Sequence, residues 1–306
     1  MNQQKALSII IVNYNSWEPM KSLFKTLAKQ TMKDFEVIAV DNASTLSQPE
    51  GIFAPLKQAS IDHQFIAHDH NAGFAAANNI GAEAATGQYL LFCNPDIEIP
   101  GDGLDTLLRV YQDNDVHILS CGQKNQLGQA KETGGSFPGI ARYAPLLGGF
   151  FKKHKAAPSQ AQIHPVDWVS GSVVLIGRDE FDRLRGWDDD FFMYMEDVDL
   201  CHRAHRQQMT VGNTMDTIWV HHHGLSSQSD TADRVRSKTS AIISKHTYIS
   251  KYFNGLRRAT GHAFVFIKYA PELVLAALLS WLIPAKELRL RRQILSSYLR
   301  KLQEKK

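Results

Sequence analysis

Cysteine is scarce in this chain, and its scarcity narrows the class of protein. Cys93, Cys121 and Cys201 are too few and too scattered for a disulfide framework or a structural zinc site, and they suit a reducing compartment. Hydrophobic residues at 43% and charged residues at 21% match an ordinary globular chain, which excludes collagen, coiled-coil and low-complexity proteins. A chain of 306 residues can bury a substantial core.

Residues 1–6 lack the basic and apolar regions of a signal peptide, so we expect the body of the protein to stay in the cytosol. The net charge of +3 hides an uneven distribution. Residues 257–306 hold 11 of the 34 Lys and Arg but 3 of the 31 Asp and Glu, which leaves residues 1–256 with 23 basic and 28 acidic side chains. A basic tail on a mildly acidic body favours an anionic surface as its partner.

Short, β-branched, apolar runs alternate with helical patterns through the first half of the chain. Such runs are typical of strands buried on both faces of a sheet, so we expect an α/β fold with a mostly parallel central sheet flanked by helices. The expected strands are 7–13, 35–40, 64–68 and 89–93, and the expected helices are 16–30 and 71–86. Sheets of this kind bind ligands at the carboxyl ends of their strands.

Polar clusters follow three of these strands, at residues 13–15, 41–44 and 94–96. Each cluster alone is explained by the preference of Asn, Asp and Ser for turns. Three clusters at the same edge of one sheet indicate a site, because separate loops of an open sheet converge on one crevice.

The second half of the chain is less regular. Residues 126–165 are predicted to be a long irregular insertion, followed by a strand over 168–176 and a helix over 196–208. That helix begins with Glu196, Asp197 and Asp199. Acidic residues stabilise a helix N-terminus on electrostatic grounds alone, so a structural role stays open beside a catalytic one.

Three carboxylates fit the transfer of a group carried on a nucleoside diphosphate. Asp41 is placed to accept hydrogen bonds from a nucleobase or ribose. Asp96 offers a hard oxygen ligand to Mg²⁺ or Mn²⁺, which neutralises charge on a leaving diphosphate. Asp197 is suited to deprotonate an acceptor hydroxyl.

Several short motifs also occur in a specific order. They are VDNAS at 40–44, NAGF at 71–74 with NNIG at 78–81, NPD at 94–96, and GWD at 186–188 followed by FFMY at 191–194 and EDVDLC at 196–201. Together they resemble the inverting family 2 glycosyltransferases of GT-A fold, most of all their bacterial rhamnosyltransferase branch. The resemblance covers roughly residues 7–227.

The resemblance implies a role for each matching position. Asp41 corresponds to the contact with the nucleotide base, and the other residues implied in binding the nucleotide sugar are Asn13, Asn15, Asn71, Gly73, Asn78 and Asn94. Asp197 corresponds to the general base, and Glu196 beside it is expected to position the acceptor. We expect a GT-A glycosyltransferase domain over 1–256, with a nucleotide-binding half to about residue 125 and an acceptor half over about 126–256. The charge and apolar pattern of residues 257–306 predicts a separate basic amphipathic helical segment.

The implied metal site lies at Asn94-Pro95-Asp96, where the family has an Asp-x-Asp motif. Asn94 replaces the first aspartate, and an amide offers one neutral oxygen, so weaker metal affinity or looser metal dependence follows. Asp96 is the expected ligand of Mg²⁺ or Mn²⁺. His221 is the expected second ligand, while the choice among His221, His222 and His223 stays open.

Other classes of site are disfavoured. A zinc hydrolase built on the three histidines is improbable, because consecutive strand residues point to opposite faces. The first strand is followed by Asn13-Tyr14-Asn15-Ser16 and not by Gly-x-Gly-x-x-Gly, which argues against a nicotinamide cofactor. The aromatic residues Trp187, Phe191, Phe192 and Tyr194 form either plain core or a stacking wall for a sugar ring.

Residues 263–285 are strongly apolar, but their longest uncharged run, 273–285, is shorter than the roughly 20 residues of a bilayer span. Flanking arginines and Trp281 favour association with the membrane surface. The alternative is a helix packed on the body or on a second subunit, as in a homodimer. Nucleic acid is not expected as a partner, because no basic face is interleaved with stacking aromatics.

We therefore expect an enzyme of bacterial surface-glycan assembly, peripheral on the inner face of the cell membrane. The resemblance implies L-rhamnose transfer from deoxythymidine-diphosphate-rhamnose to a polysaccharide or polyprenyl-linked acceptor. A UDP- or GDP-sugar donor, or a non-catalytic scaffold of the same fold, are the alternatives.

Overall fold

The computed structural model describes residues 5–125, 127–131, 133–144, 162–222, 231–283 and 285–304. The chain divides into two units. The first unit comprises Met1–Phe137, His154–Asp189 and Glu196–Gln228, and the second comprises Pro138–Lys153, Asp190–Met195 and Ser229–Lys306.

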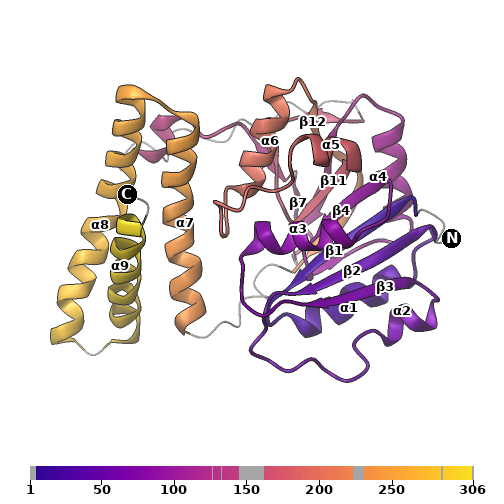
Figure 1. Cartoon of the computed structure of the whole chain (residues 1–306), viewed down its shortest axis with the longest axis horizontal. Coiled ribbons are helices and arrows are strands. Elements are labelled where there is room, and N and C mark those ends of the chain that lie inside the picture. The colour runs from indigo at the N-terminus through magenta and orange to yellow at the C-terminus, as the bar shows by residue number, and fades with distance from the viewer. Residues whose placement is uncertain are drawn as a thin grey trace. The chain divides into compact units, whose positions relative to one another are not determined.

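A mixed sheet forms the centre of the first unit (Figure 1). Its strand order is β3-β2-β1-β4-β11-β6-β12-β5, with β7 paired to β6 and β9 to β12. The strands are β1 (Leu7–Asn13), β2 (Phe35–Asp41), β3 (Asp62–Ala67), β4 (Tyr89–Cys93), β5 (Ile97–Glu98), β6 (Ile118–Lys124), β7 (Ala130–Lys131), β9 (His164–Pro165), β11 (Val173–Gly177) and β12 (Val211–His221).

Parallel pairing dominates where the apolar runs predicted it. β1 lies between β2 and β4 and is parallel to both, so the ends of these three strands lie side by side. β3 extends the parallel set from β2, and β12 is parallel to β6. β11 runs antiparallel between β4 and β6, which brings the second half of the chain into the middle of the sheet.

The single strand expected over 168–176 is instead two strands. β10 (Trp168–Val169) pairs with β8 (Gly134–Gly135) in a small separate sheet, while β11 joins the main one. Residues 170–172 turn between them, and Ser170 and Ser172 join their side chains across the turn at 3.1 Å. Polar bonding within the turn replaces strand pairing, which the apolar flanks concealed.

Helices cover both faces of the main sheet (Figure 1). Alternate residues of β1 divide between two cores, as strand geometry requires: Ile9 and Ile11 join one, and Ile10 joins the other. The first core includes residues of α1 (Trp17–Leu27), α2 (Ala54–Gln58) and α4 (Gly103–Gln112), and the second includes residues of α3 (Phe74–Ala84), α5 (Arg178–Arg183) and α6 (Glu196–Arg206).

The second unit consists mainly of three long helices, with the short helix η1 (Ile140–Tyr143), among the residues that the structure describes. They are α7 (Thr231–Tyr252), α8 (Gly255–Leu282) and α9 (Lys286–Glu304). Their apolar core includes Ile249 of α7, Val265 of α8 and Ile294 of α9. Helix α7 precedes the predicted boundary at residue 257 and packs with these helices, because its buried face contributes to their core.

One helix of the second unit is long and apolar enough to cross a membrane by length and composition alone. It spans Gly255–Trp281, and its most apolar stretch has a mean hydropathy of 1.7. Pro271 lies inside the helix.

Candidate functional site

The ends of β1 and β2 are joined by their side chains. Asn13 is fully buried, and its Nδ2 donates to Oδ1 of Asp41 at 2.7 Å and to Oγ of Ser44 at 3.0 Å. Ser44 also donates its backbone N–H to Oδ2 of Asp41 at 3.2 Å. Since Asn13 and Ser44 fix both carboxylate oxygens, Asp41 is held in one orientation at the strand edge.

The loops after these two strands are also tied together. Asn15 has a left-handed φ of 55°, and its Oδ1 accepts hydrogen bonds from the backbone N–H groups of Thr45 and Leu46, both at 2.9 Å. Asparagine tolerates this backbone conformation better than most residues. Asn15 therefore shapes the loop that follows β2.

Asn42 joins the end of β2 to the start of α3, and the sequence analysis did not assign it a role. Its Nδ2 donates to Oδ1 of Asn71 and to the carbonyl of Gly73, both at 3.1 Å, and its Oδ1 accepts from the N–H of Ala72 at 3.0 Å. Gly73 precedes α3 with φ of 91°, a conformation that favours glycine. Asn71 and Gly73, for which donor binding stays a prediction, therefore contact the residue that follows Asp41.

Asn78 lies deeper in α3. It is buried, and its Nδ2 donates to the carbonyl of Phe74 at 2.9 Å within the same helix. Its neighbour Asn79 makes the longer connection: Nδ2 donates to the carbonyl of Trp187, and Oδ1 accepts the N–H of Trp187, both at 2.9 Å. Asn79 thus attaches the Gly186-Trp187-Asp188 motif to α3.

Asp96 and His221 come together although 125 positions separate them in the sequence. Both are buried, and Nε2 of His221 lies 3.2 Å from Oδ1 of Asp96. β5 and β12 bring them together, because Ile97 pairs with His221. The backbone N–H of His222 donates to the carbonyl of Asp96 at 2.9 Å, and the His222 side chain turns to Glu98 at 2.9 Å. His223 lies outside the described residues.

The orientation of the His221 ring favours a cation at this point. Nδ1 lies 2.8 Å from Oε1 of Gln123, an oxygen that can only accept, so Nδ1 carries the proton. In the neutral ring, Nε2 then directs a lone pair toward the carboxylate of Asp96, whose Oδ1 has no hydrogen-bond partner among the described residues. Two ligand atoms at about 2.1 Å from an ion and at right angles to each other are about 3.0 Å apart, so these donors fit a divalent cation.

A short turn links this pair to Asp197. Gln123 donates from Nε2 to Oγ of Ser172 at 2.8 Å, and the carbonyl of Ser172 accepts the backbone N–H of Asn94 at 2.9 Å. The next residue back, Gly171, donates its N–H to Oδ2 of Asp197 at 3.1 Å. The turn between β10 and β11 therefore contacts the predicted metal motif and the predicted base.

The same turn also contacts the start of α3. A Cβ added at Gly171 would lie 3.3 Å from the ring of Phe74 and 3.5 Å from Cβ of Asp197. Phe74 follows Gly73, which Asn42 holds beside Asp41. Residues 41, 96 and 197 thus border one continuous set of contacts at the strand ends.

The two carboxyl groups at the start of α6 lie in different surroundings. Glu196 is buried, with Oε2 lacking a partner among the described residues, and burial together with neighbouring Asp197 raises the pKa of Glu196 well above its usual value. Burial also raises the pKa of Asp197, but the N–H groups of Gly171 and Val198 donate to its oxygens and oppose the change. Negative charge in this pair is therefore held on Asp197.

Comparison with known proteins adds the identity of this region. Residues 8–153 match the profile of Glycosyl transferase family 2. The low-salt glycan biosynthesis hexosyltransferase Agl10 of Haloferax volcanii is 28% identical over 225 residues, 70% of this chain and 66% of that protein. Residues 8–153 belong to glycosyl transferase family 2.

Other comparisons agree with this family assignment. The N-acetylglucosaminyl-diphospho-decaprenol L-rhamnosyltransferase of Mycobacterium tuberculosis is 25% identical over 272 residues, 79% of this chain and 83% of that protein. The mannosyltransferase PcManGT from Pyrobaculum calidifontis, solved with GDP-Man and Mn²⁺, aligns with a TM-score of 0.54 at 16% identity, over all of this chain and 89% of its own. The GT-A fold is thereby confirmed. The chain spans just under two thirds of the length of Agl10.

The aromatic residues near the family 2 site divide between core and surface. Trp187 and Phe191 are buried, and Trp187 packs edge-on against Phe74 and Phe92. Tyr194 is exposed at 44%, and its hydroxyl contacts Oγ of Ser237 at 2.8 Å. Trp187 therefore belongs to the core of the first unit, and Phe191 is a buried aromatic side chain.

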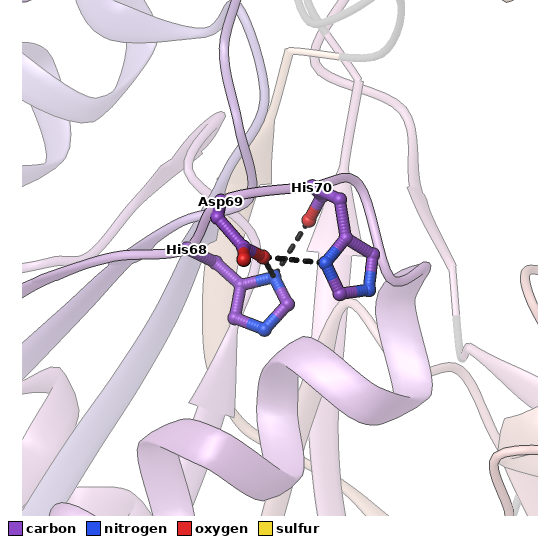
Figure 2. Close-up of side chains that lie close together, drawn as sticks. All are labelled: His68, Asp69 and His70. Atoms are coloured by element: carbon purple, nitrogen blue, oxygen red, sulfur yellow. Dashed lines mark hydrogen bonds and ion pairs between the residues drawn. The ribbon is translucent and has the colours of Figure 1, made fainter.

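A second group of metal-ligating side chains lies in the loop between β3 and α3 (Figure 2). Each of His68, Asp69 and His70 has a ligand atom within 4.8 Å of the others. Nδ1 of His70 contacts Oδ1 of Asp69 at 2.5 Å, and Nδ1 of His68 contacts the carbonyl of His70 at 2.6 Å. The backbone of His68 donates to the carbonyl of Asp41 at 2.9 Å. The spacing His-x-His is the sequence signal of this group.

Proposed function

We propose that this chain is an inverting glycosyltransferase in which Asp197 is the general base. The observation that carries the proposal is the carboxylate of Asp197 at the start of α6, accepting the N–H of Gly171 at 3.1 Å beside the strand ends. A base must be held in place and carry its charge, and both backbone donors favour the ionised form. Glu196, whose pKa is raised by burial, is proposed to position the acceptor beside Asp197.

On the donor side, Asp41 accepts from the base or ribose of the nucleotide, and Asn13 and Ser44 keep it oriented. The start of α3, with Gly73 and Asn71, binds the donor near its diphosphate, since a helix N-terminus favours negative charge. Asn15 and Asn78 complete the donor residues proposed from the sequence, Asn15 by shaping the loop and Asn78 from within α3.

Asp96 and His221 would hold a Mg²⁺ or Mn²⁺ ion, with Asn94 close by. When bound, such an ion neutralises charge on the departing diphosphate. The displacement itself is direct. Asp197 takes the proton of the acceptor hydroxyl, whose oxygen forms the new bond to the anomeric carbon as the bond to the nucleoside diphosphate breaks on the opposite face.

The proposed donor is deoxythymidine-diphosphate-L-rhamnose, and the proposed acceptor is a lipid-linked or polysaccharide glycan. The name of the mycobacterial relative supports rhamnose and a diphospho-lipid acceptor. The alternative is a different nucleotide: PcManGT was solved with GDP-Man. Incubation with dTDP-rhamnose, UDP-sugars and GDP-mannose, each with and without Mn²⁺, identifies the donor by the nucleoside diphosphate released.

The proposal is tested with Asp197→Asn in the full chain. We expect sugar transfer to fall by about 10²-fold or more, because the amide cannot accept the proton, while nucleotide binding is retained. Asp179→Asn, an exposed change on α5, is the matched control and should transfer sugar normally. Turnover of Asp197→Asn near the wild-type rate would remove Asp197 from the role of base. A chain that binds nucleotide but never transfers sugar would support a scaffold instead.

The C-terminal helices are proposed to hold the enzyme on the cytoplasmic face of the membrane. The exposed side chains of α8 include Phe266, Leu275, Leu278 and Trp281, each at least 48% exposed. Such a surface, beside basic α9, suits the boundary between acyl chains and headgroups. Flotation with anionic liposomes should recruit the full chain, and the variant Leu275→Gln/Leu278→Gln should float less. Equal flotation of both proteins would contradict membrane association through α8.

A further inference from the structure

A cavity of about 780 Å³ lies within the second unit, among α7, α9 and the segment 190–195. Its lining includes Phe192, Thr231, Arg236, Arg300 and Lys301. Three of these side chains are cationic, and among the described lining residues none is acidic. The nearby carboxylate of Asp233 is 3.9 Å from Nη1 of Arg236, a long ion pair. The cavity therefore carries an excess of positive charge.

Two further features suit an anion at this place. α7 begins at Thr231, so the N-terminal end of a 22-residue helix borders the cavity, where its dipole favours negative charge. Arginine and lysine side chains together are suited to phosphate oxygens, which arginine binds through two N–H groups and lysine as a point charge. The ammonium of Lys301 lies 5.4 Å from the ring of Phe192, so the cation and the ring form one wall.

The segment that supplies Phe192 leads directly to the proposed base. Phe192 and Asp197 are five residues apart, so the covalent chain keeps their Cα atoms within about 19 Å. The segment is fixed to α7 within the second unit: Oγ of Ser244 donates to the carbonyl of Met193, and the hydroxyl of Tyr194 contacts Ser237, both at 2.8 Å. The segment therefore joins the cavity to the proposed base through five residues of chain.

We propose that this cavity binds the diphosphate ester of the acceptor, with Arg236, Arg300 and Lys301 as its cationic ligands. This inference rests on the proposed function, because it assigns the cavity to the acceptor of that same reaction. The diphosphate is held at α7 and α9, and Phe192 packs beside the first sugar.

The first test measures binding of inorganic diphosphate to the full chain by titration calorimetry. We expect Arg300→Gln/Lys301→Gln to bind at least roughly tenfold more weakly than wild type, since each lost contact is a charge-assisted hydrogen bond. The matched control, Lys286→Gln/Arg292→Gln, removes the same charge from α9 outside the cavity lining. Equal weakening in both double variants, or none in either, would overturn the proposal.

The second test separates an acceptor from a general anionic surface. Phosphatidylcholine vesicles that carry a long-chain prenyl diphosphate should bind the wild-type protein better than the Arg300→Gln/Lys301→Gln variant. Phosphatidylglycerol vesicles of equal charge should bind both proteins equally well. The same loss on phosphatidylglycerol would make the cavity a plain membrane contact and end the proposal.

The two proposals can fail separately. If no nucleotide sugar is consumed by wild type, the proposed function fails, while the diphosphate titration still gives its own result. If transfer depends on Asp197 but Arg300→Gln/Lys301→Gln keeps the wild-type KM for a diphosphate-linked acceptor, the cavity proposal alone is wrong.

Discussion

Gln123→Leu is the substitution that most directly tests the cation site at Asp96 and His221. Gln123 holds the Nδ1–H of His221 at 2.8 Å and donates to Ser172 at 2.8 Å. Leucine has nearly the same size but cannot accept a hydrogen bond, so the ring loses the contact that directs Nε2 toward Asp96. Removing such an outer contact of a metal-ligating histidine costs about 10- to 100-fold in metal affinity, or about 1.4 to 2.7 kcal/mol.

The assay is direct binding of Mn²⁺, followed through the electron paramagnetic resonance signal of the free ion in the presence of nucleoside diphosphate. Gln123→Glu keeps an acceptor for Nδ1–H and should retain most of the affinity, while Gln112→Leu, an exposed change on α4, should not alter it. The Leu variant leaves buried polar groups unpaired, so we also expect a loss of about 1–3 kcal/mol in unfolding free energy. A folded Gln123→Leu protein with wild-type Mn²⁺ affinity would refute the assignment.

Three further predictions follow from the same contacts. His68→Ala/His70→Ala should leave Mn²⁺ affinity unchanged in the resonance assay, because we propose that Asp96 and His221 hold the ion. A loss of affinity would place the ion in the loop that carries His68 and His70. Asn79→Ala should lower the unfolding free energy in urea by roughly 2–4 kcal/mol, since it strips both backbone groups of Trp187 of their partner. Glu196→Gln should become more stable relative to wild type as pH rises above 4.5, the usual pKa of a glutamate. Above that pH the unfolded wild type loses the Glu196 proton, while the folded wild type keeps it because its pKa is raised, so the unfolding free energy of the wild type falls until the higher pKa is passed. Urea midpoints between pH 4 and pH 8 measure this gain, and a constant difference would contradict it.

The parallel part of the sheet could be predicted, because the order of apolar and polar residues along each strand is enough to identify its strands. Buried strands such as β1 and β2 appear as unbroken apolar runs, and the polar ends of those runs mark the carboxyl edge of the sheet. The antiparallel insertion of β11 could not be predicted, since its neighbours β4 and β6 are chosen by long-range packing. The turn at 170–172 was missed because its polar bonds lie between flanks that both look like strand.

The candidate site shows the same division between local and distant information. The positions of Asp41 at the end of a strand and of Asp197 at the start of a helix could be predicted, because the sequence pattern changes at both places. Asn42, Asn79 and Gln123 could not, because their partners lie 29 or more positions away and an amide side chain alone carries no sign of what it will bind. These amides hold the loops and the His221 ring in place, so they determine the precision of the site.

The segment 190–195 links helix α7 to the start of α6 through the chain. Tyr194 and Met195 both have a left-handed φ of 71°, a conformation that costs on the order of 1 kcal/mol or more for each such residue. Two contacts with α7 hold the segment at this place: Ser244 bonds the carbonyl of Met193, the residue before the pair, and Ser237 bonds the hydroxyl of Tyr194. The next two residues are Glu196 and Asp197, so relaxation of that backbone would alter the direction in which α6 begins. It follows that loosening α7 at Ser244 should impair transfer more than donor binding, even though Ser244 contacts only a backbone carbonyl.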